Sequence, residues 1–371
     1  MSVSNNATAP RLLRALAGER PEVRPVWFMR QAGRSLPEYR DLRERAGKSM
    51  LEACLDPEVA AEATLQPVRR HGVDAAVFFS DIMVPLLLAG LDVSIEPGVG
   101  PVVAEPVSDG TAVARLTRNA PKLTGSDGIR AGVARAVEEL GSPSSRTQLI
   151  DEDDSAGWVP LVGFGGAPFT LAAYLVEGRP SRDHLAARGL MHSDPLAWDA
   201  LLDWCAEATG AFMALQVEAG ASALQLFDSW AGSLSRVDYR DRVAPHSARA
   251  IEIAKRAVSP TTGRTAPLIH FGTHTSRFHD LMVSAGADAL GVDERTPLDD
   301  VARALPGVPL QGNIDPSYLT APQEILDAHV DEVLAAGDAA VSHVVNLGHG
   351  VPPTTDPAVL TGIVRRVHDH G

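Results

Sequence analysis

The chain alternates short apolar runs with longer segments of helical period. The apolar runs are rich in Val, Leu, Ile and Phe, which is typical of strands buried on both faces of a parallel sheet. We predict eight strands, at residues 25–29, 73–79, 159–164, 223–227, 267–271, 289–292, 310–314 and 343–347. Amphipathic segments lie between them, and the clearest predicted helices cover residues 56–72, 194–220, 275–287, 297–305 and 322–337.

This regular alternation favours a closed (β/α)8 barrel of the TIM type over a doubly wound sheet, because no separate strand-rich or helix-rich half exists. We therefore predict an α/β protein in which residues 1–371 form a single domain, with residues 1–20 as a lead-in. Two inserts interrupt the pattern. Residues 93–118 are expected to form a hairpin or an irregular excursion, and the polar, acidic residues 141–157 a mobile surface insert.

Composition narrows the partners that this protein can have. The net charge of −14 argues against nucleic acid and anionic membranes, which both reward clustered Lys and Arg. The only two cysteines, Cys54 and Cys205, cannot form a disulfide framework or a multi-cysteine metal site. The N-terminal residues lack the apolar core of a signal peptide, and the apolar run at 82–90 is too short to span a bilayer. We expect a cytoplasmic protein.

Charged residues come directly after several of the predicted strands. In a barrel of this type, the functional groups lie at the carboxyl ends of the strands. Arg30 and Arg34 follow the first strand, and two neighbouring guanidinium groups suit carboxylates or phosphates. Asp81 follows the second strand among apolar residues, where a carboxylate needs a charged or N–H partner. His349 lies between two glycines after the last strand. These residues predict an anion-binding pocket that contains one carboxylate of its own and no metal.

Other polar residues have plainer interpretations. Asp293 and Asp315 are expected to cap the segments that follow them. His270 and His274 have the spacing of a helical zinc pair, but the intervening Gly272 favours a loop. The glycines of GFGG at 163–166 match neither the dinucleotide-binding nor the P-loop spacing, so we interpret them as packing positions.

Six ordered motifs together resemble the uroporphyrinogen decarboxylase family. They are PVWFMRQAGRSLPEYR (25–40), FFSDIMVP (78–85), GFGGAPFTLAAYLVEG (163–178), LQLFDSWAG (224–232), QGNIDP (311–316) and NLGHGVPP (346–353). The resemblance spans essentially the whole chain. The acidic insert at 141–157 departs from the family pattern. It lies at the amino end of the third predicted strand, away from the expected site.

The resemblance implies a barrel that forms homodimers and acts in haem biosynthesis without a metal or organic cofactor. Its expected substrate is uroporphyrinogen III, whose four acetate side chains lose CO2 and become methyl groups, giving coproporphyrinogen III. Asp81 is the implied central catalytic carboxylate. Arg30 or a bound water is the candidate proton donor, and the choice between them stays open. The implied substrate contacts are Arg30, Gln31, Ala32, Gly33, Arg34, Asp81, Tyr174, Ser229 and His349.

Two other functions are compatible with this type of barrel. Zinc-dependent, corrinoid-linked methyltransferases that resemble the decarboxylases need a His-x-Cys and a later Cys, whereas the corresponding stretch here, IHFGTH, has no cysteine. The second alternative is a non-catalytic tetrapyrrole-binding protein, and the presence of Asp81 argues against it.

A purely structural role is also open for Tyr174, because this residue lies on the apolar face of a predicted helix.

Overall fold

The strands form a closed parallel barrel. The computed structural model describes residues 9–141 and 158–370, and seven of the strands lie in one sheet in the order β1-β4-β5-β6-β7-β8-β9, every neighbouring pair parallel. Their bounds are β1 Ala76–Val77, β4 Leu161–Gly166, β5 Ala223–Phe227, β6 Leu268–Phe271, β7 Ala289–Gly291, β8 Leu310–Gln311 and β9 His343–Val344.

The first predicted strand closes this sheet into a barrel. Val26 forms a parallel bridge with Val345 beside β9, and its carbonyl accepts a hydrogen bond from the Asp74 N–H, 2.8 Å away, just before β1. The Asp74 carboxylate in turn accepts from the Val26 N–H at 2.8 Å. Both edges of the sheet are therefore paired through the segment around Val26, as an eight-stranded barrel requires.

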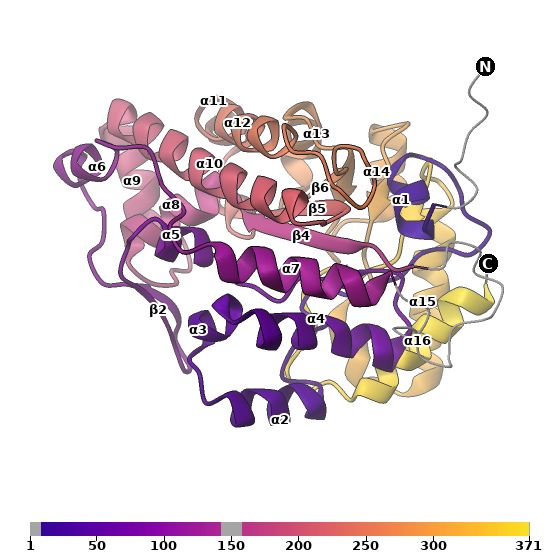
Figure 1. Cartoon of the computed structure of the whole chain (residues 1–371). Coiled ribbons are helices and arrows are strands. Elements are labelled where there is room, and N and C mark those ends of the chain that lie inside the picture. The colour runs from indigo at the N-terminus through magenta and orange to yellow at the C-terminus, as the bar shows by residue number, and fades with distance from the viewer. Residues whose placement is uncertain (1–8, 142–157, 371) are drawn as a thin grey trace, which may run out of the picture.

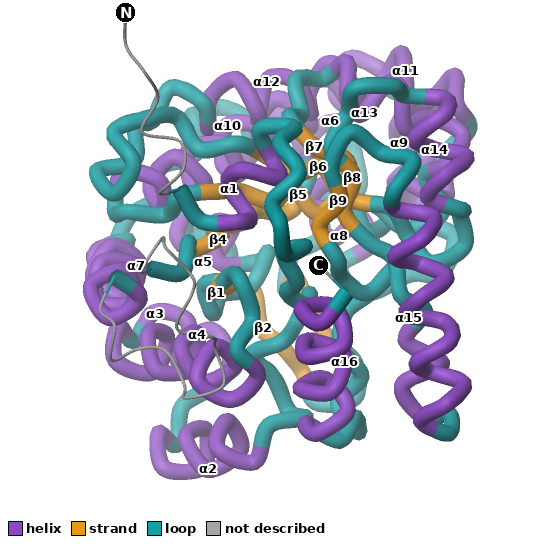
Figure 2. Tube along the Cα trace, turned by 90° about the vertical axis from the view of Figure 1, so that its right-hand side faces the viewer, coloured by secondary structure: helices purple, strands orange, loops and turns teal. Residues whose placement is uncertain are grey.

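Helices surround the barrel on its outside (Figure 1, Figure 2). The helices before β4 are α1 Arg11–Leu16, α2 Pro37–Ala46, α3 Met50–Leu55, α4 Pro57–His71, α5 Val84–Leu88, α6 Gly110–Leu116 and α7 Asp127–Leu140. The later ones are α8 Pro168–Glu177, α9 Leu185–Ser193, α10 Pro195–Glu218, α11 Arg236–Arg242, α12 Ala244–Ala254, α13 His279–Ser284, α14 Leu298–Ala304, α15 Gln323–Gly337 and α16 Pro357–Asp369, with 3₁₀ turns at Ala231–Ser233, Ser276–Phe278 and Pro316–Thr320. No helix in the described part of the chain is long and apolar enough to cross a membrane.

The glycines of the GFGG motif allow α10 to approach β4 closely. A Cβ atom on Gly163 would lie 2.9 Å from Oε1 of Gln216 on α10, and one on Gly165 would collide with Thr209 of the same helix. The Gln216 side chain uses this space to accept from the Phe164 N–H and to donate to the Phe164 carbonyl. The packing interpretation of these glycines is therefore confirmed.

Side chains that point inward fill the barrel in layers. Gln311 of β8 donates to Gln225 of β5 across the interior at 2.9 Å, and Gln225 also contacts the sulfur of Met29 at 3.2 Å. One step further along the strands, Phe227 meets Phe164 and Phe271 edge to face, with ring centroids 5.5 and 6.0 Å apart. Three phenylalanine rings thus form an apolar layer toward the carboxyl ends of the strands.

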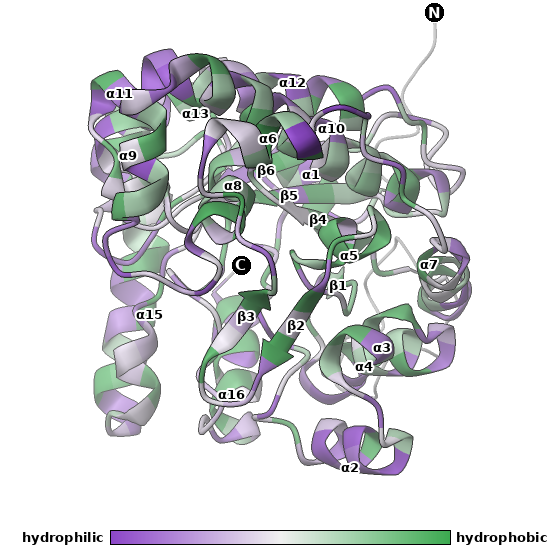
Figure 3. Ribbon diagram, turned by 90° about the vertical axis from the view of Figure 1, so that its left-hand side faces the viewer, coloured by the Kyte–Doolittle hydropathy of each residue, from purple (hydrophilic) through white to green (hydrophobic). Residues whose placement is uncertain are grey.

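The predicted barrel is confirmed, while several predicted elements differ in extent. Residues 73–79 contribute only the two-residue strand β1, because the chain turns away soon after it to form the site. Residues 93–118 form the antiparallel hairpin of β2 (Val93–Glu96) and β3 (Gly100–Val103), followed by α6, as Figure 3 shows. The predicted mobile insert at 141–157 lies outside the described residues, apart from Gly141.

Candidate active site

Arg30 occupies the turn that ends the first strand. The Met29 N–H donates to Oδ1 of Asn346 at 3.0 Å, and the Met29 carbonyl accepts from the Val351 N–H at 2.8 Å. Arg30 itself has a φ of 61°, in the left-handed region, which is unusual for a residue with a side chain. Its side chain is exposed and makes no hydrogen bond or ion pair with any other described residue. The fold therefore holds an unneutralised cation at this turn.

Gln31 anchors the same turn from inside. Its side chain is fully buried, its Oε1 accepts from the Phe28 N–H at 3.0 Å, and its Nε2 donates to the Ala75 carbonyl at 2.9 Å. The amide thus ties the turn to the segment entering β1. The Gln31 N–H donates to the Phe28 carbonyl at 3.1 Å, so with both side-chain atoms also used by the protein only the backbone carbonyl is left for a substrate contact.

Residues 32–34 present free donors next to Arg30. None of their backbone N–H groups has a hydrogen-bond acceptor in the described part of the chain, and the exposed Arg34 guanidinium has no ion-pair partner there. Successive free N–H groups and arginines are well suited to carboxylate ligands. Gly33 also leaves room for the Arg30 carbonyl, which would lie 3.1 Å from an added Cβ.

Asp81 lies between β1 and α5 and is partly buried. Its Oδ1 accepts from the Met83 N–H at 2.9 Å, while its other oxygen has no partner in the described chain. Burial raises the pKa of the Asp81 carboxyl, and the Met83 hydrogen bond and the Arg30 charge oppose that rise. The carboxylate therefore caps the turn with one oxygen and keeps the other available.

Tyr174 of α8 is near both charges. Its pKa is raised, mainly by burial and further by the Asp81 charge, while the Arg30 charge acts in the opposite direction. The phenol is therefore a hydrogen-bond donor at neutral pH. Its hydroxyl has no hydrogen-bond partner among the described residues. Ser229, just after β5, is also only partly buried, and its hydroxyl has no hydrogen-bond partner within residues 9–141 and 158–370, while its carbonyl accepts from the Thr273 hydroxyl at 2.8 Å.

His349 lies on the loop after β9 and is exposed to solvent. Its pKa is lowered by partial desolvation and by the Arg30 and Arg295 charges, so the ring is neutral at pH 7. The flanking glycines are required by close contacts: a Cβ on Gly348 would collide with the backbone of Glu294, and one on Gly350 would lie 2.5 Å from Cδ of Arg30. The loops after β7 and β9 and the Arg30 turn thus meet at one edge.

Replacing Gly350 by Ala should displace the Arg30 side chain, because the new methyl group would occupy the position of its aliphatic stem. We expect a KM for the substrate raised by roughly tenfold, the cost of about one weakened charged hydrogen bond, with kcat changed less. Steady-state kinetics measure this effect. Gly362→Ala is the matched control, since an added Cβ there has no neighbour within 4 Å. An unchanged KM for Gly350→Ala would contradict the placement of Arg30.

The raised pKa of Asp81 predicts a dependence of stability on pH. Above its folded-state pKa, the folded protein has to ionise a buried carboxyl; below the pKa of an unfolded Asp, near 4, the group is protonated in both states and this cost is absent. Asp81→Asn should therefore raise Tm at pH 7, by ~1–2 °C for a cost of about 1 kcal/mol in a chain of 371 residues, and the difference should shrink toward pH 4. Calorimetry at both pH values measures it, and an equal Tm at pH 7 would count against the burial cost.

His270 and Asp228, two polar residues near strand ends, lie outside the barrel wall. His270 pairs in register with Leu226, whose side chain packs among the outer helices, and both His270 and Asp228 are fully buried. His270 Nε2 lies 3.8 Å from Asp228 Oδ2. They face the layer between barrel and helices, so they cannot reach a ligand at the mouth.

The loop after β6 keeps His274 apart from His270. His274 has a φ of 59°, and its N–H donates to Oδ2 of the buried Asp293 at 2.7 Å. Asp293 therefore links two loops and does not cap a helix, whereas Asp315 caps its 3₁₀ turn through the Ser317 N–H, as predicted. Among the described residues, no group of three or more His, Cys, Asp or Glu side chains could hold a metal ion.

Sequence reasoning missed several side chains at the mouth. The phenylalanine layer of the barrel could have been predicted from the sequence, because alternation along each strand puts Phe164, Phe227 and Phe271 on the inward face. Arg295 on the loop after β7 is half exposed and influences His349, but it is also paired with Glu294. No motif distinguishes such an arginine from a surface residue.

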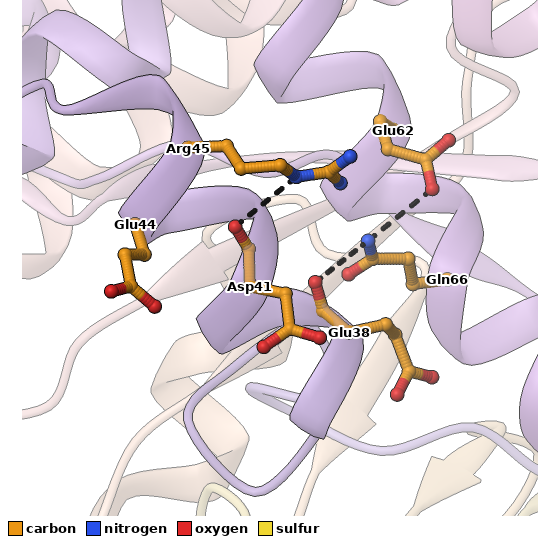
Figure 4. Close-up of a pocket in the computed structure, with 6 residues that line it drawn as sticks. All are labelled: Glu38, Asp41, Glu44, Arg45, Glu62 and Gln66. Atoms are coloured by element: carbon orange, nitrogen blue, oxygen red, sulfur yellow. Dashed lines mark hydrogen bonds between the residues drawn. The ribbon is translucent and has the colours of Figure 1, made fainter.

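A hollow on the outer surface lies away from these residues. It has a volume of about 660 Å³ and lies between α2 and α4, lined by Glu38, Asp41, Glu44, Arg45, Glu62 and Gln66 (Figure 4). Gln66 donates there to the Glu38 carbonyl and the Glu62 carboxylate. Its four carboxylates outnumber Arg45, the one cation of its lining, and neighbouring arginines of the described chain pair with only two of them, Glu38 and Glu62. The remaining excess of negative charge favours the mouth as the anion site.

Comparison with known proteins shows clear relatives. The family model for uroporphyrinogen decarboxylase (URO-D) matches residues 7–370. A uroporphyrinogen decarboxylase of Arthrobacter sp. (strain FB24) is 55% identical over 360 residues, covering 96% of this chain and 96% of the relative. Another from Streptomyces coelicolor is 53% identical over 345 residues, covering 93% and 90%.

A solved structure of lower similarity shares the architecture. A methyltransferase from Methanosarcina mazei superposes with a TM-score of 0.74 at 20% identity, covering 97% of this chain and 98% of that protein. At this level of identity the likeness shows the fold alone. It agrees with the barrel observed here.

Proposed function

Because the chain belongs to the uroporphyrinogen decarboxylase family, we propose that it removes CO2 from the four acetate side chains of uroporphyrinogen III to give coproporphyrinogen III. The observation that carries this proposal is the charge arrangement at the barrel mouth. A partly buried carboxylate, Asp81, lies within the influence of the unpaired cation Arg30, and free N–H groups at 32–34 lie beside that cation. A ring with N–H groups at its centre and carboxylates at its edge complements this arrangement.

The substrate itself can supply the electron sink that decarboxylation needs. Protonation of the pyrrole carbon next to the acetate-bearing one gives an azafulvenium-like cation. The electrons of the breaking C–C bond then form an exocyclic double bond as CO2 leaves. Protonation of that methylene carbon and loss of the added ring proton give the methyl group. Each cycle consumes one proton and releases one CO2.

Asp81 is proposed to stabilise the positive charge that develops on the ring. Its free oxygen can accept hydrogen bonds from pyrrole N–H groups, and the charge is already fixed in place by the Met83 N–H. An ion pair at 4 Å is worth about 4 kcal/mol at an effective dielectric constant of 20. Enzymes lower barriers by ~8–23 kcal/mol, so Asp81 supplies one part and the intrinsic reactivity of the substrate another.

The rim residues are proposed to hold the carboxylates. Arg30 and Arg34 offer unpaired guanidinium groups, and Tyr174, Ser229 and the neutral His349 offer hydrogen bonds. Ala32 and Gly33 would contribute through their free N–H groups. Gln31 keeps only its backbone carbonyl free, because its N–H donates to the Phe28 carbonyl, so its proposed contact would accept from a substrate N–H group and would not hold a carboxylate. Arg30 is a poor acid because its pKa exceeds about 12, so a water bound beside it is an equally suitable proton donor.

The proposal includes no metal or organic cofactor, a homodimeric assembly and a cytoplasmic location. A zinc-dependent methyltransferase is the alternative within this fold, and it needs thiolate ligands. Cys54 and Cys205 are both fully buried within helices, and burial raises the pKa of each thiol, so both stay protonated. The cysteine chemistry therefore favours the decarboxylase.

The experiment is anaerobic incubation of the protein with uroporphyrinogen III. The products are oxidised and separated, and porphyrins with seven, six, five and four carboxylates should appear in succession. Parallel reactions with a metal chelator should proceed at the same rate. A failure to lose CO2 would refute the proposed reaction, and a rate abolished by the chelator and restored by a metal would refute its independence of metal ions.

A further inference from the structure

Trp230 lies between two other aromatic rings beside the mouth. Its ring centroid is 3.8 Å from that of Tyr174 and 4.4 Å from that of His184, with interplanar angles of 34° and 33°. We propose that Trp230 is a positioning residue: by stacking on Tyr174 it fixes the direction in which the Tyr174 hydroxyl meets a substrate carboxylate. This inference rests on the proposed function, since Tyr174 acts there as a carboxylate donor.

The tyrosine hydroxyl has no other means of fixing its orientation. It makes no hydrogen bond within the described part of the chain, and only 8% of the Tyr174 residue is exposed. Its ring is therefore oriented by packing alone. Aromatic pairs prefer particular relative orientations of their two rings, beyond what the buried area alone supplies, so a tilted indole at 34° specifies the Tyr174 ring orientation in a way that an aliphatic side chain does not. Among the described residues, Trp230 is the aromatic ring that contacts it, with the two centroids 3.8 Å apart.

His184 also packs against the indole, with ring centroids 4.4 Å apart. Its Nδ1 lies 3.2 Å from the Ser233 hydroxyl, which donates to the Trp230 carbonyl at 2.9 Å. The His184 backbone has a φ of 49°, a conformation that non-glycine residues adopt at a cost and that the surrounding structure must enforce. The histidine is buried, so it backs the stack from within the protein.

A buried hydrogen-bond chain ties the same tryptophan to the helix that carries Tyr174. Thr170, one turn before Tyr174 on α8, donates to Oδ1 of Asp228 at 3.1 Å and accepts from the Trp230 N–H at 3.4 Å. Thr170 and Asp228 are both fully buried. Both the backbone and the ring of Trp230 are thus held against α8. This contact gives the buried Thr170 and Asp228, which lie outside the barrel wall, a structural role.

The proposal is tested with the variants Trp230→Leu, Trp230→Phe and Tyr174→Phe and the double variant Trp230→Leu/Tyr174→Phe. We expect Trp230→Leu to raise KM for uroporphyrinogen roughly tenfold, the scale of one hydrogen bond to a charged group, and Trp230→Phe to stay within about threefold because it keeps a stacked ring. If Trp230 acts through Tyr174, the double variant should be no worse than the worse single variant.

Several results would overturn this role. Multiplicative losses in the double variant would mean that Trp230 acts independently of Tyr174. An equal loss in Trp230→Phe and Trp230→Leu would assign the effect to the indole N–H. Trp204→Leu, which removes a buried indole from α10, should lower Tm without raising KM; if it raises KM equally, the effect is general loosening.

The same variants distinguish this inference from failure of the proposed function. Binding of coproporphyrinogen III, followed by protein fluorescence under anaerobic conditions, gives a Kd that needs no turnover. If the wild type binds but does not convert uroporphyrinogen, the proposed reaction fails while the coupling between Trp230 and Tyr174 is still measured in Kd. Additive effects on Kd would then overturn the positioning role by itself.

Discussion

Asp81→Asn is expected to lower kcat by about 10²–10³-fold, the scale seen when one preorganised electrostatic contact to a transition state is removed, while KM changes less than about threefold. The reason is that the substitution removes the fixed negative charge that faces the developing ring cation. The asparagine oxygen can still accept from the Met83 N–H, so the turn into α5 keeps its cap. Steady-state kinetics under anaerobic conditions measure both constants.

The control for this variant is Asp356→Asn. Asp356 accepts from the Ala358 N–H at the start of α16 in the same manner as Asp81 accepts from Met83, but it caps a helix on the outside of the barrel. Its kcat should equal that of the wild type. If Asp81→Asn retained its kcat, the electrostatic role of Asp81 would be wrong; if only KM rose, Asp81 would be a binding residue.

Arg30→Ala is expected to raise KM by about 10- to 100-fold, because each hydrogen bond to a charged partner contributes about 1.5–3 kcal/mol. Arginine and alanine both carry a Cβ and are equally strained at a φ of 61°, so the backbone cost is the same in both proteins. The effect should decline as salt concentration rises, since the lost contact is electrostatic. Measurement of KM at low and high salt tests both parts.

Arg365→Ala provides the comparison, since Arg365 is exposed on α16 and has no ion pair within the described chain. It should leave KM unchanged at both salt concentrations. Should Arg30→Ala lower kcat as strongly as it raises KM, Arg30 or a water that it holds would be the proton donor. A wild-type KM in Arg30→Ala would remove it from the site.

The order of elements was predictable because each depends on local pattern. Continuous apolar strands between amphipathic helices specify a parallel barrel, and the polar residues after each strand then fall at one end. The prediction located Arg30, Asp81 and His349 near one another for this reason. Strand lengths were predicted less well: the segment at 25–29 contributes a single bridge at Val26, because Arg30 turns the chain outward.

The sequence did not predict the features of the site that depend on the direction of individual side chains. Gln31 lies within a motif of apparent binding residues, yet its amide is used to hold the turn. His270 and Asp228 follow strands as site residues do, but strand alternation directs both away from the mouth. The stacking of Trp230 between Tyr174 and His184 joins three distant segments, and no local pattern records such a contact.

The most direct test of the account is an anaerobic crystal structure with coproporphyrinogen III bound. We predict that the pyrrole N–H groups point at Asp81 within hydrogen-bond distance of its free oxygen. Carboxylates of the ligand should contact Arg30, Arg34 and the N–H groups at 32–34, with Tyr174 and His349 at the rim. A ligand whose N–H groups face away from Asp81, or one bound outside the barrel mouth, would contradict the central claim.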